Sequence, residues 1–111
     1  MKVVLCGAND YNKKYFLNPD FSQLPEQVKK ELNILCVKFT QQQSGIFSMG
    51  FNEDGTLLFS TEHGPNDDKY DEVSCDEAIR NVQKDNSELI WQLTLFYNVM
   101  ILGKSPDEIK R

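Results

Sequence analysis

The chain lacks the residue groupings on which most motif-defined catalytic and metal sites depend. Its 111 residues include one histidine, His63, and three cysteines, no two of which stand in C-x-x-C spacing. A zinc knuckle and a disulfide framework are therefore not indicated. It has no glycine-rich phosphate loop, no G-x-S-x-G elbow and no histidine pair. The sequence predicts no metal site, no cofactor and no assignable catalytic residue.

Positive charge and long apolar runs are also scarce. The net charge is -5 and the lysines are scattered as pairs such as Lys13 with Lys14, which disfavours binding to nucleic acid and to anionic membranes. No segment supplies the roughly 18 apolar residues of a membrane-spanning helix. The apolar run from Val3 to Cys6 is too short for the core of a signal peptide. We expect a protein of the reducing cytoplasm, where an odd number of free cysteines is usual.

The most informative segment that is present runs from Ile46 to Glu62. Its residues Asn52 to Gly55 are typical of a type I turn closed by a glycine in the left-handed region. Counting outward from that turn predicts a β-hairpin with three facing pairs, Phe51 with Leu57, Met49 with Phe59, and Phe47 with Thr61. The large side chains of these pairs share one face, as the alternation of a strand requires.

Shorter signals predict the elements before the hairpin. A first strand is expected over Lys2 to Cys6, stopped by the turn-forming residues from Gly7 to Asp10, and a second over Tyr15 to Leu17. Pro25 suits the first residue of a helix that Ser44 and Gly45 end. Helical spacing places one apolar stripe on it, formed by Val28, Leu32, Leu35, Cys36 and Phe39.

After the hairpin, residues 63 to 71 form a polar loop. Ser74 and Glu77 have the spacing of a capping box, so a helix is expected to begin at Ser74. The polar residues from Lys84 to Ser87 interrupt its apolar pattern, and residues 75 to 102 fit either one helix or two. The elements together predict one α+β domain over residues 1–111, with a small antiparallel sheet around the central hairpin and two or three helices packed on one face.

The segment from Leu89 to Leu102 is apolar on every side, since eleven of its fourteen residues are apolar or aromatic. Such a helix must be covered all round, either as the centre of its own domain or by another molecule. A chain of this length offers little material for full cover. We therefore expect a homodimer, with a central core helix as the alternative, and the expected interface residues are Trp91, Leu95, Phe96, Tyr97 and Leu102.

Three side chains are weak candidates for a ligand site. Cys6 is expected at the end of the first strand, beside Gly7, where a thiol can be presented to solvent. Tyr11 and His63 are the polar groups available to a cleft there, although nothing in the sequence brings His63 near Cys6. Cys75 is the other thiol of interest, because a helix N-terminus can lower a thiol pKa. An inert, buried Cys6 remains the alternative.

Four segments together resemble a known group of proteins. They are LCGAN at Leu5 to Asn9, KYFLN at Lys14 to Asn18, FSQLP at Phe21 to Pro25, and FNEDGTLLF at Phe51 to Phe59. They resemble the small uncharacterised proteins of anaerobic Gram-positive bacteria that carry a domain of unknown function. The resemblance implies a bacterial cytoplasmic protein and brings no activity, cofactor or site residue.

Two function classes therefore stay open. The first is a non-catalytic interaction or accessory protein that acts as a homodimer. The second is a small enzyme or ligand-binding protein with a cleft near Cys6. A closed helix interface with unreactive thiols favours the first class, and a deep pocket that contains an activated Cys6 favours the second.

Overall fold

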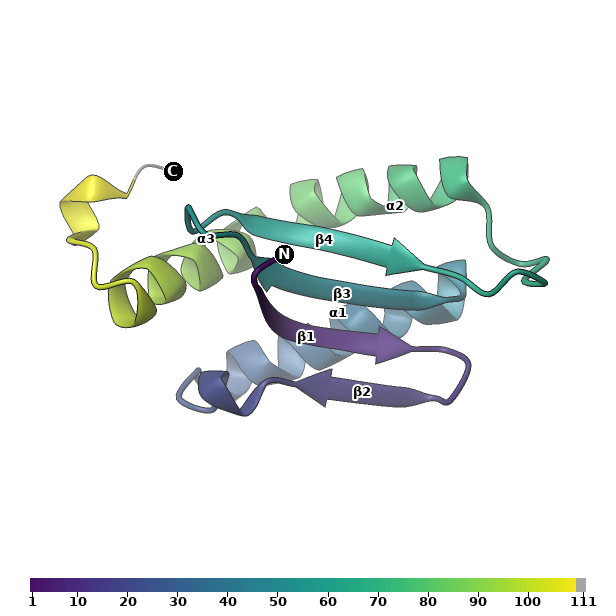
Figure 1. Cartoon of the computed structure of the whole chain (residues 1–111), viewed down its shortest axis with the longest axis horizontal. Coiled ribbons are helices and arrows are strands. Elements are labelled where there is room, and N and C mark those ends of the chain that lie inside the picture. The colour runs from purple at the N-terminus through teal and green to yellow at the C-terminus, as the bar shows by residue number, and fades with distance from the viewer. Residues whose placement is uncertain (110–111) are drawn as a thin grey trace.

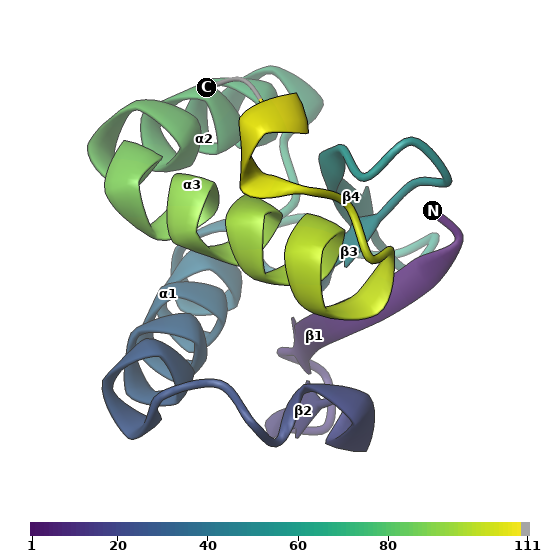
Figure 2. The ribbon, with the colours of Figure 1, turned by 90° about the vertical axis from the view of Figure 1, so that its left-hand side faces the viewer.

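A computed structural model describes residues 1–109 as two layers, one of strands and one of helices (Figure 1). The sheet is antiparallel, in the order β2-β1-β3-β4, with β1 at Val3–Asn9, β2 at Lys14–Leu17, β3 at Ile46–Phe51 and β4 at Leu57–Glu62. The helices are α1 at Glu26–Gln43, α2 at Glu72–Asp85 and α3 at Ser87–Phe96. Figure 2 shows all three on the same side of the sheet. The predicted α+β class, with helices on one face of a small antiparallel sheet, is confirmed.

The central hairpin has the predicted register. Phe51 pairs with Leu57, Met49 with Phe59, and Phe47 with Thr61. The turn is closed by a hydrogen bond from the Gly55 amide to the Asn52 carbonyl at 3.0 Å, and Gly55 has φ +88°. A side chain is rarely stable at such a φ, which is why glycine stands there.

Strand β1 is longer than predicted. It continues through Gly7 and Ala8 to Asn9, and Ala8 is buried. The expectation that Gly7 stops the strand is wrong, because here glycine allows a close approach: a Cβ on Gly7 would lie 2.9 Å from the Phe47 carbonyl oxygen. Cys6 therefore lies within a central strand and not at its end.

Helix α1 carries the predicted apolar stripe. Val28, Leu32, Cys36 and Phe39 are buried, and Leu35 packs against them. Pro25 precedes the helix by one position, as its N-cap, where its missing N–H costs nothing. The chain leaves the helix through Ser44 and Gly45, with φ +66° and φ +79°.

Helix α2 begins two residues before the expected capping box. Asp71 is the N-cap, and its carboxylate accepts a hydrogen bond from the Val73 amide at 3.2 Å. The Ser74 hydroxyl instead donates to the Gln43 side chain of α1 at 3.2 Å. The prediction of a cap at Ser74 is wrong because that hydroxyl is used in a contact between helices.

Residues 75 to 102 form two helices. The break falls at Asn86, whose φ of -120° and ψ of 31° lie outside the helical region. Helix α3 then continues into a single π-helical turn, Tyr97–Ile101. The two-helix alternative is thereby the correct one.

An aromatic stack joins the end of α3 to the sheet. The Tyr97 ring lies 4.1 Å from the Phe51 ring with an interplanar angle of 3°, and Phe21 stacks on both. Tyr97 is only 2% exposed. Tyr97, one of the five predicted interface residues, is thus part of the chain's own core, which the inner side of α3 and its π turn closes.

Candidate functional site

Cys6 lies in a buried sulfur cluster between the sheet and α1. Its Sγ is 3.7 Å from Cys36 Sγ, which in turn is 3.9 Å from Met49 Sδ, and all three side chains are fully buried. Contact with the Cys6 side chain and burial raise the pKa of the Cys36 thiol. A thiol enclosed in this way cannot meet a solute without opening of the core. Cys75 is also buried, at 1% exposure.

Tyr15 adds a polar group beside this cluster. Its hydroxyl is buried and has no hydrogen-bond partner among residues 1–109. Burial first, and the neighbouring Cys6 second, raise the pKa of Tyr15. The sequence gives no signal for this placement, because Tyr15 reaches the cysteines only through the pairing of β2 with β1.

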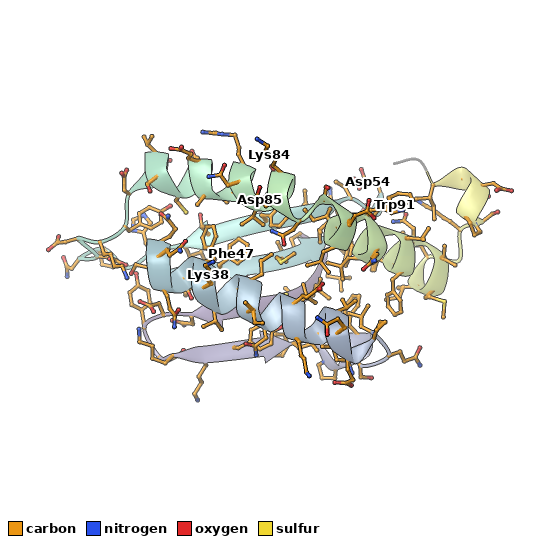
Figure 3. All side chains as sticks on the ribbon, turned by 180° about the vertical axis from the view of Figure 1, so that it is seen from behind. Lys38, Phe47, Asp54, Lys84, Asp85 and Trp91 are labelled. Atoms are coloured by element: carbon orange, nitrogen blue, oxygen red, sulfur yellow. The ribbon has the colours of Figure 1, made fainter. Side chains whose placement is uncertain are left out.

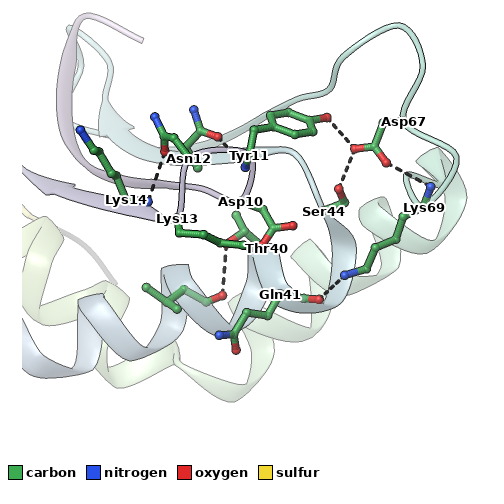
Figure 4. A network of polar contacts seen from close by, with 12 residues as sticks. Asp10, Tyr11, Asn12, Lys13, Lys14, Thr40, Gln41, Ser44, Asp67 and Lys69 are labelled. Carbon is green, nitrogen blue, oxygen red and sulfur yellow. Dashed lines mark hydrogen bonds and ion pairs between the residues drawn. The ribbon is translucent and has the colours of Figure 1, made fainter.

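Tyr11 lies elsewhere, at the rim of the molecule, where three loops meet (Figure 4). Its hydroxyl donates to Asp67 Oδ2 at 2.5 Å and accepts a hydrogen bond from the Gly64 amide at 2.8 Å. The Ser44 hydroxyl donates to the same Asp67 oxygen at 2.6 Å. The network thus fastens the polar loop of residues 63–71 to the β1–β2 turn and to the end of α1.

His63 belongs to this loop and not to the sulfur cluster. Its ring stacks on Tyr70 at 4.0 Å, and Nδ1 lies 3.0 Å from the Gly64 carbonyl oxygen. No contact joins His63 to Cys6 within the described residues. The structure therefore brings Tyr11 to the His63 loop and leaves both apart from the thiol.

The hydrogen bonds to the Asp67 carboxylate should make the free energy of unfolding depend on pH in the acid range. Hydrogen bonds from Ser44 first, and from Tyr11 second, lower its pKa below the ordinary 3.8. A carboxyl group whose pKa is lower in the folded state than in the unfolded state stabilises the fold at pH values above its unfolded-state pKa. That contribution is lost as the pH falls through the folded-state pKa. We expect Asp67→Asn to destabilise the protein at pH 7, and the difference from wild type to shrink toward pH 3.

Urea unfolding between pH 3 and pH 7 measures that difference. The matched control is Asp68→Asn, because Asp68 makes no hydrogen bond among residues 1–109. A deficit of Asp67→Asn that stays constant over this pH range would contradict the predicted role of the carboxylate.

A hollow with a volume of about 790 Å³ lies between α1 and α2. Lys38 on α1 and Asp85 on α2 are among the polar residues along it, and Figure 3 labels both. Apolar residues from both helices also line it, namely Ile34, Leu35, Phe39, Ala78 and Val82. A smaller hollow of about 340 Å³ between β2 and α1 reaches Leu17, the register neighbour of Cys6. Cys6 lines neither.

An apolar patch remains uncovered where the helical layer ends. Met100, Ile101 and Leu102 are 62%, 45% and 38% exposed. Trp91, Leu95 and Phe96 on α3 are half-buried. We call these six residues the C-terminal patch. It includes four of the five predicted interface residues, since Tyr97 alone is in the core.

The second uncovered surface is the side of the sheet that faces away from the helices. Three rows of side chains cross it, two from β2 to β4 and one from β1 to β4, and we call them the open sheet face. The first row is Lys14, Asn9, Ile46 and Glu62, the second is Phe16, Gly7, Ser48 and Ser60, and the third is Val4, Gly50 and Leu58. Phe16 is 53% exposed and Val4 is 42% exposed.

Comparison with known proteins agrees with the extent of the fold. Residues 2–105 match the model of a family of unknown function, DUF6145. The chain belongs to the DUF6145 family. No curated protein matches the chain, and no solved structure matches it. The expected membership of a family of unknown function is thus confirmed, and it transfers no activity, cofactor or site residue to this DUF6145 protein.

Two further findings describe this DUF6145 chain over residues 1–109. No three side chains of histidine, cysteine, aspartate or glutamate there are grouped so that they could hold a metal ion. None of the helices in that range has both the length and the apolar character needed to cross a bilayer.

Proposed function

We propose that this DUF6145 protein is a non-catalytic interaction or accessory protein that acts as a homodimer in the cytoplasm of an anaerobic Gram-positive bacterium. The observation that carries the proposal is the apolar surface left uncovered by the chain's own fold. Helices cover only one face of the sheet, and the C-terminal patch exposes three consecutive large apolar residues. Adjoining apolar groups of this kind mark surfaces that bind other proteins.

The burial of the thiols argues against an activity that depends on a cysteine nucleophile. All three cysteines are free and buried. A catalytic thiol requires access to its substrate and a stabilised thiolate, whereas burial raises the pKa of Cys36. Three free thiols also suit the reducing cytoplasm. The anaerobic bacterial origin rests on the four sequence segments that resemble proteins of that group.

Solution mass tests the proposal directly. We expect light scattering after size-exclusion chromatography of the reduced protein to give a mass above that of the 12.8 kDa chain, and to rise with concentration. Association must persist with dithiothreitol present, which separates it from chance disulfide linkage. A mass of one chain at every concentration up to the millimolar range would contradict the homodimer.

A small ligand-binding protein is the second candidate function. The hollow between α1 and α2 is large enough for a small molecule and combines apolar and polar lining residues. Ala78→Trp would fill it from α2. Thermal stabilisation of the wild type by a member of a metabolite library, absent in Ala78→Trp, would favour this function.

A further inference from the structure

We propose that the open sheet face binds the same face of a second copy of this chain, about a two-fold axis that runs parallel to the strands. The inference rests on the proposed homodimer and names its interface. The proposal follows from the charges and the side-chain sizes that the strand register places in rows.

The open sheet face has the composition of a contact surface. Phe16, Val4 and Met1 are 53%, 42% and 44% exposed, while the centre of the face holds Gly7 and Ser48. The Met1 side chain lies over Gly50, because a Cβ built on Gly50 would meet Met1 Sδ at 2.4 Å. Large apolar groups therefore border a shallow centre, and the helices lie on the other side of the sheet (Figure 2).

The first row supplies charge complementarity. It begins with Lys14 on the edge strand β2 and ends with Glu62 on the edge strand β4. A two-fold axis parallel to the strands exchanges the two edges, so that β2 of one copy faces β4 of the other. Each Lys14 then meets Glu62 of the second copy, and the symmetry makes this ion pair twice. Neither residue has an ion-pair partner within residues 1–109.

The other two rows supply complementarity of size. Under the same axis, Phe16 of one copy faces Ser60 of the other, and Gly7 faces Ser48. In the third row, Val4 faces Gly50 and the Met1 side chain that lies over it. Each large side chain thus meets a small residue or a flexible thioether, which lets the faces approach closely. The strands of the two sheets are then aligned with one another, as is usual where sheets pack face to face.

The alternative two-fold axis, perpendicular to the strands, gives a poor match. It would place β2 of one copy against β2 of the other and bring the two Phe16 side chains together. It would also turn the first row against the third, so that Glu62 faces the apolar Leu58. Burying a charge against an apolar side chain is unfavourable. Only the parallel axis pairs both charges.

The size of the face predicts a weak dimer. Four strands spaced about 4.8 Å apart, with about six residues each at about 3.3 Å, give roughly 400 Å² on each copy. The total of roughly 800 Å² is below the about 1,200 Å² at which stable specific interfaces begin, and is of the size found in weak, transient associations. We expect a dissociation constant in the micromolar range and a marked dependence on salt, since the ion pairs lie at the exposed edges.

The test is sedimentation equilibrium of the full chain at low salt, from about 1 to 500 µM. Phe16→Asp is expected to raise the dissociation constant by at least about 30-fold, because it buries a charge in both halves of the interface. Lys14→Glu and Glu62→Lys are each expected to weaken association about tenfold. The double variant Lys14→Glu with Glu62→Lys should restore it, since both ion pairs form again with reversed sign.

Two controls separate this inference from the homodimer itself. Lys30→Glu makes the same charge change on the exposed side of α1 and should leave the dissociation constant unchanged. Met100→Asp alters the C-terminal patch. A dimer that survives Phe16→Asp and is dissociated by Met100→Asp would overturn the sheet interface and keep the homodimer. A wild type that stays monomeric throughout overturns both, and failure of the charge-reversed pair to restore association overturns the proposed axis.

Discussion

Replacing Tyr97 with alanine is expected to lower the free energy of unfolding by about 3 to 5 kcal/mol, the range found when a buried aromatic side chain is truncated. Tyr97 is 2% exposed and stacks on Phe51 at 4.1 Å and on Phe21 at 6.3 Å. Its removal leaves a cavity between α3 and the sheet and also breaks the ring contacts, each of which adds stability beyond burial alone. Urea unfolding followed by circular dichroism at low protein concentration measures the loss.

Met100→Ala is the matched control for this prediction. Met100 lies three residues farther along the same π turn and is 62% exposed. Its replacement is expected to change the free energy of unfolding by no more than about 0.5 kcal/mol. An equal effect of the two substitutions would contradict the assignment of Tyr97 to the core, as would an effect of Tyr97→Ala that appears only on the mass of the assembly.

Gly45→Ala is the second substitution with a large expected effect, a loss of about 3 kcal/mol or more in the free energy of unfolding. Gly45 has φ +79°, and a Cβ there would lie 2.3 Å from the Glu62 carbonyl oxygen at the end of β4. The positive φ alone costs a side chain about 1 to 2 kcal/mol. The contact adds to this cost because the colliding atom belongs to the backbone, which cannot rotate away.

Gly103→Ala separates the two causes. Gly103 has a similar φ of +70°, but a Cβ there meets nothing within 4 Å. This control is expected to show only the cost of the backbone conformation. The difference between the two alanine variants in urea unfolding then measures the collision with β4, and equal losses would show that no collision occurs.

The hairpin could be predicted residue by residue because its signals are local. The turn residues fix where the strands reverse, and the alternation of apolar residues fixes which face is buried, so both select one register. The stripe of α1 is predictable for the same reason, since spacing along one helix decides which residues share a face. The two-layer α+β class follows from these elements.

The misplaced boundaries depended on partners that are distant in the sequence. The sequence around Gly7 predicts the end of a strand, whereas in the structure Gly7 allows β1 to pass close to the Phe47 carbonyl of β3. The sequence around Ser74 predicts a helix cap, whereas in the structure its hydroxyl donates to the side chain of Gln43, 31 residues earlier. A local pattern carries no information about such neighbours, so the strand end and the cap were both misplaced.

The candidate site shows the same limit more strongly. The sequence suggests Tyr11 and His63 as polar groups of a cleft near Cys6, yet Tyr11 hydrogen-bonds to Asp67 and to the Gly64 amide in an exposed loop. Cys6 contacts Cys36, which is 30 positions away and inside the core. Packing between elements decides that Cys36 of α1 lies against Cys6. It also decides that the loop of residues 63–71 folds over the turn that contains Tyr11.

The apolar segment from Leu89 to Leu102 marks the division between the two sources of information. Its composition determined that part of it must be buried, because so much apolar surface is unstable in water. Only the tertiary structure decided that Tyr97 and the polar Asn98 face inward, Asn98 donating a hydrogen bond to the Gly55 carbonyl at 3.1 Å. The sequence by itself determined the hairpin, the helix of residues 26–43 and the α+β class through contacts between near neighbours. The core, the buried thiols and the two uncovered faces were decided by how those elements pack, which depends on distances between residues that the order of the chain does not specify.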